Sequence, residues 1–326
     1  MSTMKAISFT ESGPTSELIY ADIPTPVPGP GEVRVRVRMS GVNPSDWKSR
    51  LRGTYGRSEQ PKVPHHDGVG IIDEVGDGVS SDRLGERVWL YFAAWQRPHG
   101  TAAQWCTVPA SHAVPLDESI PDDVGASLGI PALTAHNLLG DIAALAGRSV
   151  LVSGFGAVGF AATQLARWAG ARVVVSTSSP EKQKAAIELG ADAVVDPSSP
   201  DAADQFKAVL PAGAVRIVEP ALGSNLIRDL AALTPGGTVA VYATEGDPVT
   251  EFPVRSFIDL NARLAFTMVY RLGTDDVMRA VTDITQALAA GYLRGYPVHH
   301  FDLEDTAEAQ KALALNVFGK VIVNIP

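Results

Sequence analysis

The sequence predicts an α/β protein with a doubly wound parallel sheet and a second, barrel-like β domain, and three observations support this fold class. A short apolar strand, a glycine-rich turn, a helix and a second apolar strand follow one another in residues 148–176. Strand and helix patterns then alternate as far as residue 269, which is typical of parallel sheets. Residues 1–110 instead contain many short strands separated by Gly and Pro, which is typical of a compact β domain.

Composition narrows the class of protein. The 326 residues are enough for two domains, and 45% hydrophobic with 19% charged residues is ordinary for a globular protein. A net charge of −9, with Lys and Arg scattered along the chain, argues against a nucleic-acid partner. The first residues lack the apolar core of a secretory signal and no apolar run is long enough to cross a bilayer, so we expect a cytoplasmic protein without a membrane partner. The single cysteine, Cys106, excludes an intrachain disulfide and a multi-cysteine zinc lobe, and we interpret it as a core residue.

The first strands are predicted from apolar periodicity. Residues 4–9 and 17–20 predict a hairpin. In residues 32–39 valine and arginine alternate, so we expect a strand whose valines face the core and whose arginines face solvent.

Residues 40–56 predict a loop whose polar and aromatic side chains suit the rim of a ligand site. Gly68 and Gly70 lie within a strand pattern and predict close approach of another backbone. Further strands are predicted at residues 87–92 and 103–108.

The pattern changes to helices at residue 122. Residues 122–146 predict helices with a break at Pro131, because proline lacks the N–H that a helix interior needs. After the glycine-rich turn, strands are predicted at residues 171–176, 192–196, 215–220, 237–243 and 263–269, and helices at 181–190, 203–210, 225–234 and 275–290. A final strand at residues 319–325 can return to complete the β domain.

The glycine-rich turn reads GFGAVG and predicts a dinucleotide site, because it lies between a strand and a helix. Gly154 allows the tight turn, Gly156 lets the backbone approach a pyrophosphate, and Gly159 lets helix and strand pack closely. Ala157 and Val158 begin the helix, whose free N–H groups attract phosphates. The alternative is a glycine-rich turn of an ordinary β-α-β unit without a ligand.

The end of the second strand favours NADP(H) over NAD(H) as the cofactor. An NAD site usually has a carboxylate there, whereas this chain has hydroxyl side chains followed by a cation: Ser176, Thr177, Ser178, Ser179 and Lys182. Hydroxyls and an ammonium can accept a 2′-phosphate, which a carboxylate would repel. The alternative is that Ser178 or Ser179 caps the next helix, with Pro180 at its first position. Both roles can hold together.

Motifs over nearly the whole chain resemble the medium-chain dehydrogenase/reductase superfamily, specifically its zinc-free quinone oxidoreductase branch. The resemblance rests on the order and spacing of the segments GVNPSDWKSR (41–50), VPHHDGVGIIDEVGDGV (63–79), GTAAQWCTVPASHAVPLDESIPDDVGASLGIPALTAHNLL (100–139), LVSGFGAVG (151–159), LTPGGTVAVYA (233–243) and FGKVIVNIP (318–326). It implies a GroES-like catalytic domain of residues 1–123 and 273–326. It also implies a Rossmann NADP-binding domain of residues 124–272.

The resemblance also implies an activity. Such proteins transfer hydride from NADPH to a small-molecule quinone or related conjugated carbonyl, and they are homodimers or homotetramers. An enoyl or alkenal double-bond reductase is the first alternative. A zinc-dependent alcohol dehydrogenase and a non-enzymatic NADPH sensor are further alternatives.

Site residues follow from the same resemblance. Asn43 and Tyr55 are expected to line the substrate cleft, where each can donate a hydrogen bond to a substrate oxygen. The residues expected beside the nicotinamide are Thr134, Tyr242, Ala243, Thr244, Phe266, Met268 and Asn324.

We predict no metal. Zinc-containing relatives have a catalytic cysteine in the segment that here reads NPSDW, and this chain has Ser45 and Asp46 there. Asp46, His66 and Asp67 are an alternative ligand set, but the soft thiolate ligand is missing. His66 is otherwise a hydrogen-bonded residue of the cleft wall.

Overall fold

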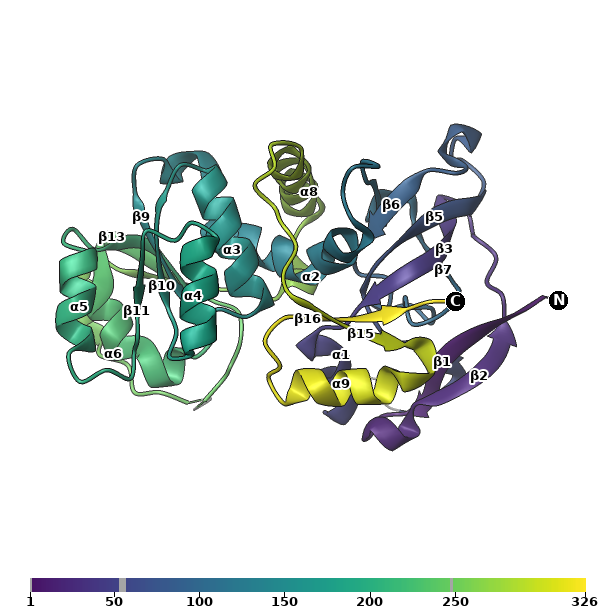
Figure 1. Cartoon of the computed structure of the whole chain (residues 1–326), viewed down its shortest axis with the longest axis horizontal. Helices are drawn as coiled ribbons and strands as arrows, with labels where there is room; N and C mark the ends of the chain where they lie inside the picture. The colour runs from purple at the N-terminus through teal and green to yellow at the C-terminus, as the bar shows by residue number, and fades with distance from the viewer. Residues whose placement is uncertain (1, 53–56, 247–248) are drawn as a thin grey trace. The chain divides into compact units, whose positions relative to one another are not determined.

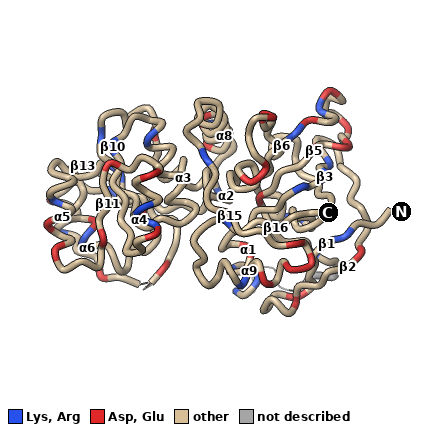
Figure 2. The backbone as a smooth tube through the Cα atoms, viewed as in Figure 1, with Lys and Arg blue, Asp and Glu red and all other residues tan. Residues whose placement is uncertain are grey.

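The computed structural model describes residues 2–52, 57–246 and 249–326 (Figure 1). The chain divides into two compact units, which we call unit 1 (Met1–Ile130 with Gly295–Pro326) and unit 2 (Pro131–Arg294). The limits between these units differ from the domain limits expected from the sequence, which lie after residue 123 and before residue 273. Figure 2 shows Lys and Arg interspersed with Asp and Glu along both units.

Unit 1 contains two sheets. The smaller one has the strand order β2-β1-β4, and the larger one has the order β15-β16-β3-β5-β6-β8, with β7 also paired to β3. The strands are β1 (Thr3–Glu11), β2 (Ile19–Pro24), β3 (Glu32–Gly41), β4 (Arg57–Lys62), β5 (Asp67–Val75), β6 (Arg87–Leu90), β7 (Trp105–Pro109), β8 (Ala113–Pro115), β15 (Val298–Asp302) and β16 (Lys320–Asn324). The helices that lie wholly in it are α1 (Pro44–Leu51) and α9 (Thr306–Ala314).

The alternation in β3 is confirmed. Val33, Val35 and Val37 are at most 2% exposed and belong to one hydrophobic cluster with residues of β5, β6 and β7. The predicted close approach at Gly70 is also confirmed, because a Cβ there would lie 2.3 Å from the carbonyl oxygen of Arg36 on the neighbouring strand. β16 pairs antiparallel with β3, so the end of the chain returns to the sheet that its first residues begin.

Unit 2 is built on a parallel sheet with the strand order β11-β10-β9-β12-β13-β14. Its strands are β9 (Ser149–Ser153), β10 (Arg172–Ser176), β11 (Ala193–Val195), β12 (Ala214–Glu219), β13 (Leu233–Val241) and β14 (Arg263–Phe266). Its helices are α3 (Ala157–Trp168), α4 (Pro180–Glu188), α5 (Ala202–Val209), α6 (Leu222–Ala232), α7 (Val254–Leu260) and α8 (Thr274–Ala289).

Helices cover both faces of this sheet. Leu151 of β9 clusters with Phe206 of α5 and Leu226 of α6 on one face. A Cβ at Gly159 of α3 would meet the side chain of Val152, the next residue of β9, which points to the opposite face. This arrangement is the predicted doubly wound sheet.

Two predictions about local structure are wrong. Residues 44–51 form α1 rather than loop, because Pro44 suits the first helical position and the Asp46 carboxylate accepts the backbone N–H of Asn43 at 2.7 Å. The helix α2 (Asp122–Leu139) continues through Pro131 without a break. Pro131 removes one hydrogen bond of the helix, to the carbonyl of Ser127, and the burial of the neighbouring Ala132 and Leu133 offsets this loss. The N–H of Ile130 is donated to the Asp67 carboxylate at 2.8 Å.

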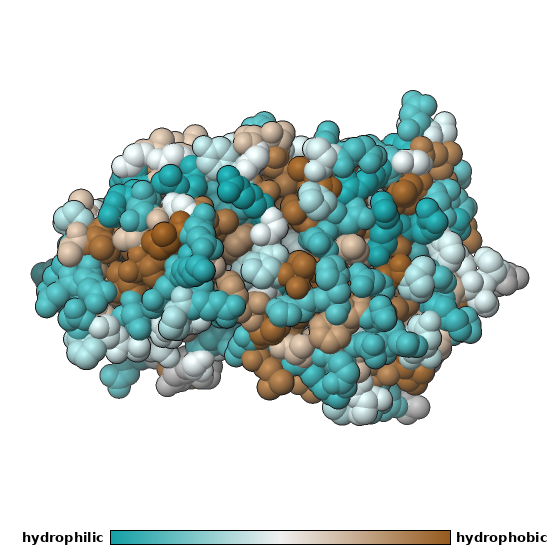
Figure 3. All heavy atoms as spheres, in the orientation of Figure 1, coloured by the Kyte–Doolittle hydropathy of each residue, from teal (hydrophilic) through white to brown (hydrophobic). Residues whose placement is uncertain are grey.

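No helix within the described ranges is long and apolar enough to cross a bilayer. The face drawn in Figure 3 mixes hydrophilic and hydrophobic side chains.

A buried pair of carboxyl groups lies between β12 and α6. Glu219 and Asp229 are both 0% exposed, and Glu219 accepts hydrogen bonds from the N–H of Ala221 and from Asn225 Nδ2. Burial and the neighbouring Glu219 carboxylate raise the pKa of Asp229 to about 9. Asp229 therefore keeps its proton in the folded protein at neutral pH.

Asp229→Asn is expected to raise the free energy of unfolding. Unfolded Asp229 loses its proton near pH 4, whereas the folded carboxyl holds it to about pH 9. Unfolding of the wild type therefore releases a proton between these values, and its stability falls with rising pH. The advantage of the variant should grow over the same range in denaturant titrations. Asp204→Asn, at an exposed position of α5, is the control, and a difference that does not depend on pH would contradict the prediction.

Candidate functional site

The carboxyl ends of the parallel strands of unit 2 position most of the predicted cofactor residues. β9 and β12 lie side by side at the centre of the sheet, β10 and β11 follow on one side, and β13 and β14 follow on the other. Ligands of open α/β sheets bind at such a reversal of strand order, outside the carboxyl ends.

The glycine-rich turn between β9 and α3 has the conformation that its sequence predicts. Gly154 has a φ of +76°, in the left-handed region that favours glycine, and its N–H is donated to the carbonyl of Ser176 at 2.8 Å. A Cβ at Gly159 would lie 2.3 Å from the carbonyl oxygen of Gly154, so only glycine allows this close packing. Gly156 differs, because its φ is −93° and nothing lies within 4 Å of an added Cβ.

Gly156 is exposed and is the N-cap of α3, with no side chain to cap the helix. Ala157 and Val158 are half-buried and begin the first turn. The first intrahelical hydrogen bond is from the N–H of Phe160 to the carbonyl of Gly156 at 2.8 Å. The preceding N–H groups of the turn, with the helix dipole, form a site suited to an anion.

The hydroxyl side chains lie at the end of β10, as the sequence predicts. Ser176 and Thr177 are buried, Ser178 is exposed, and Ser179 is the N-cap of α4 and accepts the N–H of Lys182. The capping role proposed for Ser179 is therefore confirmed, with Pro180 at the first helical position. The described residues give the half-buried side chain of Lys182 no ion pair.

Two buried hydroxyl groups lie beside this turn. Ser153 and Ser176 are opposite each other at the ends of β9 and β10. Each hydroxyl is buried and has no hydrogen-bond partner among the described residues. Buried hydroxyls without partners are uncommon, so this end of the sheet has unused hydrogen-bonding capacity.

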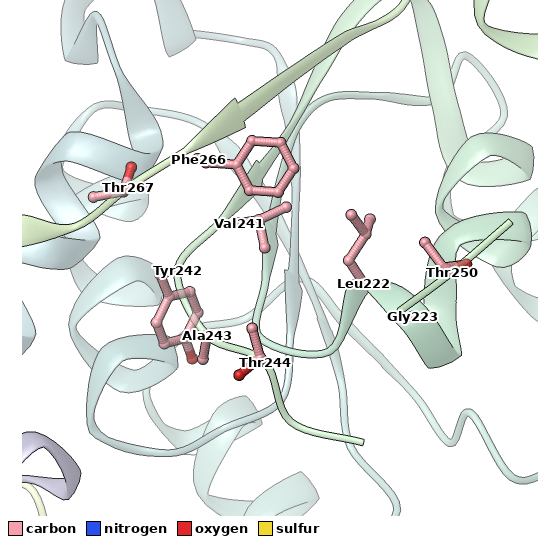
Figure 4. A pocket seen from close by; sticks show the side chains of 9 residues that line it. All are labelled: Leu222, Gly223, Val241, Tyr242, Ala243, Thr244, Thr250, Phe266 and Thr267. Atoms are coloured by element: carbon pink, nitrogen blue, oxygen red, sulfur yellow. The ribbon is translucent and has the colours of Figure 1, made fainter. Parts of the chain in front are cut away.

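A pocket of about 220 Å³ lies at the carboxyl ends of β13 and β14 (Figure 4). It brings together four residues predicted to contact the cofactor, which are Tyr242, Ala243, Thr244 and Phe266. Figure 4 shows Phe266 over Val241 and Leu222 facing them from the start of α6. Met268 is 51% exposed and does not line the pocket.

Sequence reasoning did not name five other lining residues: Leu222, Gly223, Val241, Thr250 and Thr267. Leu222 and Gly223 follow the carboxyl end of β12, so the predicted strand order was a signal that could have found them. Thr267 follows β14 for the same reason.

Thr134 is buried in the part of α2 that belongs to unit 2. Asn137 lies three residues further on the same side of the helix, and its Oδ1 accepts a hydrogen bond from Thr267 Oγ1 at 2.8 Å. Because Thr267 lines the pocket, this hydrogen bond connects the Asn137 side of α2 to the pocket.

The predicted substrate residues belong to unit 1. Asn43 is 2% exposed, and its side chain lies between two charged groups. Its Nδ2 donates to Asp67 Oδ2 at 2.7 Å, and its Oδ1 accepts from Lys320 Nζ at 2.8 Å. Asn324 is half-buried in β16, with its Oδ1 3.1 Å from His300 Nδ1. Tyr55 lies outside the described residues.

Asp46 and His66 lie beside this network. Asp46 Oδ1 is 3.7 Å from His66 Nε2. Burial raises the pKa of Asp46 to about 8 and lowers the pKa of His66 to about 3, so both groups favour their neutral forms at neutral pH. Lys320 Nζ lies 3.5 Å from Asp67 Oδ2. Burial raises the pKa of Asp67 and lowers the pKa of Lys320, and the attraction between the two charges opposes both shifts. Within the part of the chain that the structure describes, no three His, Cys, Asp or Glu side chains form a metal-binding group.

Comparison with known proteins places this architecture in a family. Residues 29–118 match the alcohol dehydrogenase GroES-like domain, and residues 157–286 match the zinc-binding dehydrogenase family. The predicted combination of a GroES-like domain with a Rossmann sheet is therefore confirmed.

Individual relatives extend the likeness to nearly the whole chain. The quinone oxidoreductase of Rattus norvegicus is 30% identical over 327 residues, which cover 98% of this chain and 97% of that protein. A mycobacterial protein solved in complex with NADPH is 28% identical with a TM-score of 0.83, covering 98% of this chain and 99% of the other. An NAD-dependent alcohol dehydrogenase is 26% identical with a TM-score of 0.88, covering 99% of this chain and 100% of the other. The chain thus belongs to the medium-chain dehydrogenase/reductase superfamily of oxidoreductases and, within it, to the quinone oxidoreductase-like family.

Proposed function

We propose that this protein is an NADPH-dependent oxidoreductase that reduces a quinone or a related conjugated carbonyl. The observation that supports it most is the turn at Gly156, where an anion-binding helix start adjoins a strand end carrying hydroxyls and Lys182. The rat relative is named a quinone oxidoreductase, and the mycobacterial neighbour was solved with NADPH.

The cofactor is NADP(H), and the residues present fit it. The space beside Gly156 accepts a pyrophosphate, and the first-turn N–H groups of α3 hydrogen bond to it. Lys182 pairs with the 2′-phosphate, and the hydroxyls of Ser176 to Ser179 supply further donors. The residues after β13 and β14, with Thr134, hold the nicotinamide.

When bound, NADPH supplies a hydride to the acceptor, which also takes up a proton. The protein's task is to hold the acceptor and to stabilise the charge that develops on its oxygen. Asn43 donates a hydrogen bond to that oxygen, and Tyr55 contributes a second donor or an aromatic contact. Asn324 and Met268 complete the surroundings of the nicotinamide. We propose that no metal takes part, because Lys320 already supplies the cation beside Asp67.

The function is tested by following the absorbance of NADPH with phenanthrenequinone and a benzoquinone. Rapid oxidation is expected, and it should persist after treatment with a chelator that removes zinc. Loss of activity with the metal would overturn the metal-free reaction. Binding of NADPH without quinone reduction, but with reduction of an enone or enoyl thioester, would move the assignment to the double-bond reductases.

Lys182→Ala is expected to raise the dissociation constant for NADPH at least tenfold and to leave that for NADH nearly unchanged. The reason is that a hydrogen bond between charged groups contributes about 1.5–3 kcal/mol, and every 1.4 kcal/mol is a factor of about ten. Titration calorimetry with both cofactors checks this. Lys184→Ala is the control, because Lys184 is exposed on the same helix. Equal weakening of both cofactors would reject the 2′-phosphate role.

Gly156→Val is expected to weaken both cofactors more than tenfold while the protein stays folded. Any residue can adopt the backbone conformation of Gly156, and no protein atom lies within 4 Å of an added Cβ. The valine side chain would therefore meet the bound cofactor and not the protein. Thermal unfolding and cofactor titration measure the two effects separately. Gly273→Val is the matched control, because Gly273 is likewise an N-cap with ordinary φ in unit 2. Unchanged affinity would mean that the turn is structural alone.

A further inference from the structure

Lys320 is a buried lysine whose contact with Asn43 the proposed function does not use. It begins β16, the last strand of the chain, and is 2% exposed. Lysine is almost never fully buried unless it is paired. Its Nζ lies 2.8 Å from Asn43 Oδ1 and 3.5 Å from Asp67 Oδ2.

The three side chains are held together by neighbouring strands. Gly41 at the end of β3 pairs with Asp67 of β5 on one side and with Ile322 of β16 on the other. Asn43 follows Gly41 by two residues, and its backbone N–H is donated to Asp46 Oδ2. The network is therefore anchored on three strands and on the start of α1.

The two charged groups determine which way the Asn43 amide faces. An ammonium can only donate hydrogen bonds, and an ionised carboxylate can only accept them. The observed orientation puts the amide oxygen against Lys320 and the amide nitrogen against Asp67. The flipped orientation would place donor against donor and acceptor against acceptor, so it loses both hydrogen bonds.

Asp67 is itself fixed in place. Its Oδ1 accepts the N–H of Ile130 at 2.8 Å, so the carboxylate cannot turn to follow a flipped amide. A Cβ at Gly129 would lie 2.0 Å from the same oxygen, which shows how closely α2 packs on it. The orientation of Asn43 thus depends on groups that have little freedom to move.

One N–H of the Asn43 amide remains available. The nitrogen carries two hydrogens, and the described residues supply an acceptor for one of them, Asp67. Asn43 is 2% exposed, so a substrate oxygen can reach only a small part of its side chain. Whether it meets the amide oxygen or the amide nitrogen decides whether a hydrogen bond can form. With the oxygen facing Lys320, the atom available to a carbonyl acceptor is the nitrogen.

We propose that Lys320 is a positioning residue, whose ammonium holds the Asn43 amide in the orientation that donates an N–H to the carbonyl oxygen of the acceptor. This inference rests on the proposed function for the identity of the acceptor. The orientation itself depends on the contacts within unit 1 alone. An ammonium on the amide oxygen also polarises the amide and strengthens its N–H as a donor.

The orientation is tested by NMR without any activity assay. The chain has six asparagines, so ¹⁵N-asparagine labelling gives a small set of side-chain amide signals, and Asn43→Asp identifies those of Asn43. In the wild type these signals should exchange slowly with solvent. Lys320→Met should shift them and speed their exchange at least tenfold, whereas Lys311→Met, at an exposed lysine of α9, should leave them unchanged. Unchanged Asn43 signals in folded Lys320→Met would overturn the proposal.

Kinetics supply the second readout. Lys320→Met should lower kcat for quinone reduction at least tenfold while the dissociation constant for NADPH stays within twofold, since the cofactor residues of unit 2 are untouched. An equal loss of cofactor affinity, or no loss of kcat, would overturn the positioning role. If the single variant does not fold, Lys320→Met with Asp67→Asn removes both charges and is expected to show the same changes. A wild type that binds NADPH but reduces no quinone would refute the proposed function, and the NMR result would still decide the orientation.

Discussion

The carboxylate of Asp67 is the group on which the architecture of unit 1 depends. It accepts the N–H of Ile130 in α2, it accepts a hydrogen bond from Asn43, and it lies beside the ammonium of Lys320. Removing one partner of a buried ion pair costs about 3–5 kcal/mol, because the remaining charge is left without compensation. A single side chain therefore connects β5, α1, α2 and β16.

In unit 2 the candidate cofactor site is shaped by the backbone of the glycine-rich turn rather than by buried charges. Gly154 and Gly159 have structural reasons to be glycine, a positive φ and a close contact, whereas Gly156 has neither. No protein atom fills the space beside Gly156, as expected if a bound ligand occupies it. The strand order brings this turn and the pocket after β13 and β14 to the same edge of the sheet.

The fold was largely predictable because its signals are local. The strand, turn and helix around Gly154 and the alternation in β3 depend on residues that are neighbours in sequence. The failures have a common physical origin. The continuation of α2 through Pro131 depends on tertiary packing around Ala132 and Leu133, and the surroundings of Asn43 depend on Lys320, 277 residues later. Local periodicity carries no information about such partners, so the hydrogen bonds of Asn43 could not be predicted from the sequence.

The return of β16 to β3 also has a consequence for biosynthesis. Unit 2 is one continuous segment, and its last residue, Arg294, is synthesised before β15 and β16, which complete unit 1. Domains generally fold as units during synthesis. All residues of unit 2 are therefore synthesised while the larger sheet of unit 1 still lacks the strand that pairs with residues 39–41 of β3. The network of Asn43, Asp67 and Lys320 can form only when translation has supplied Lys320.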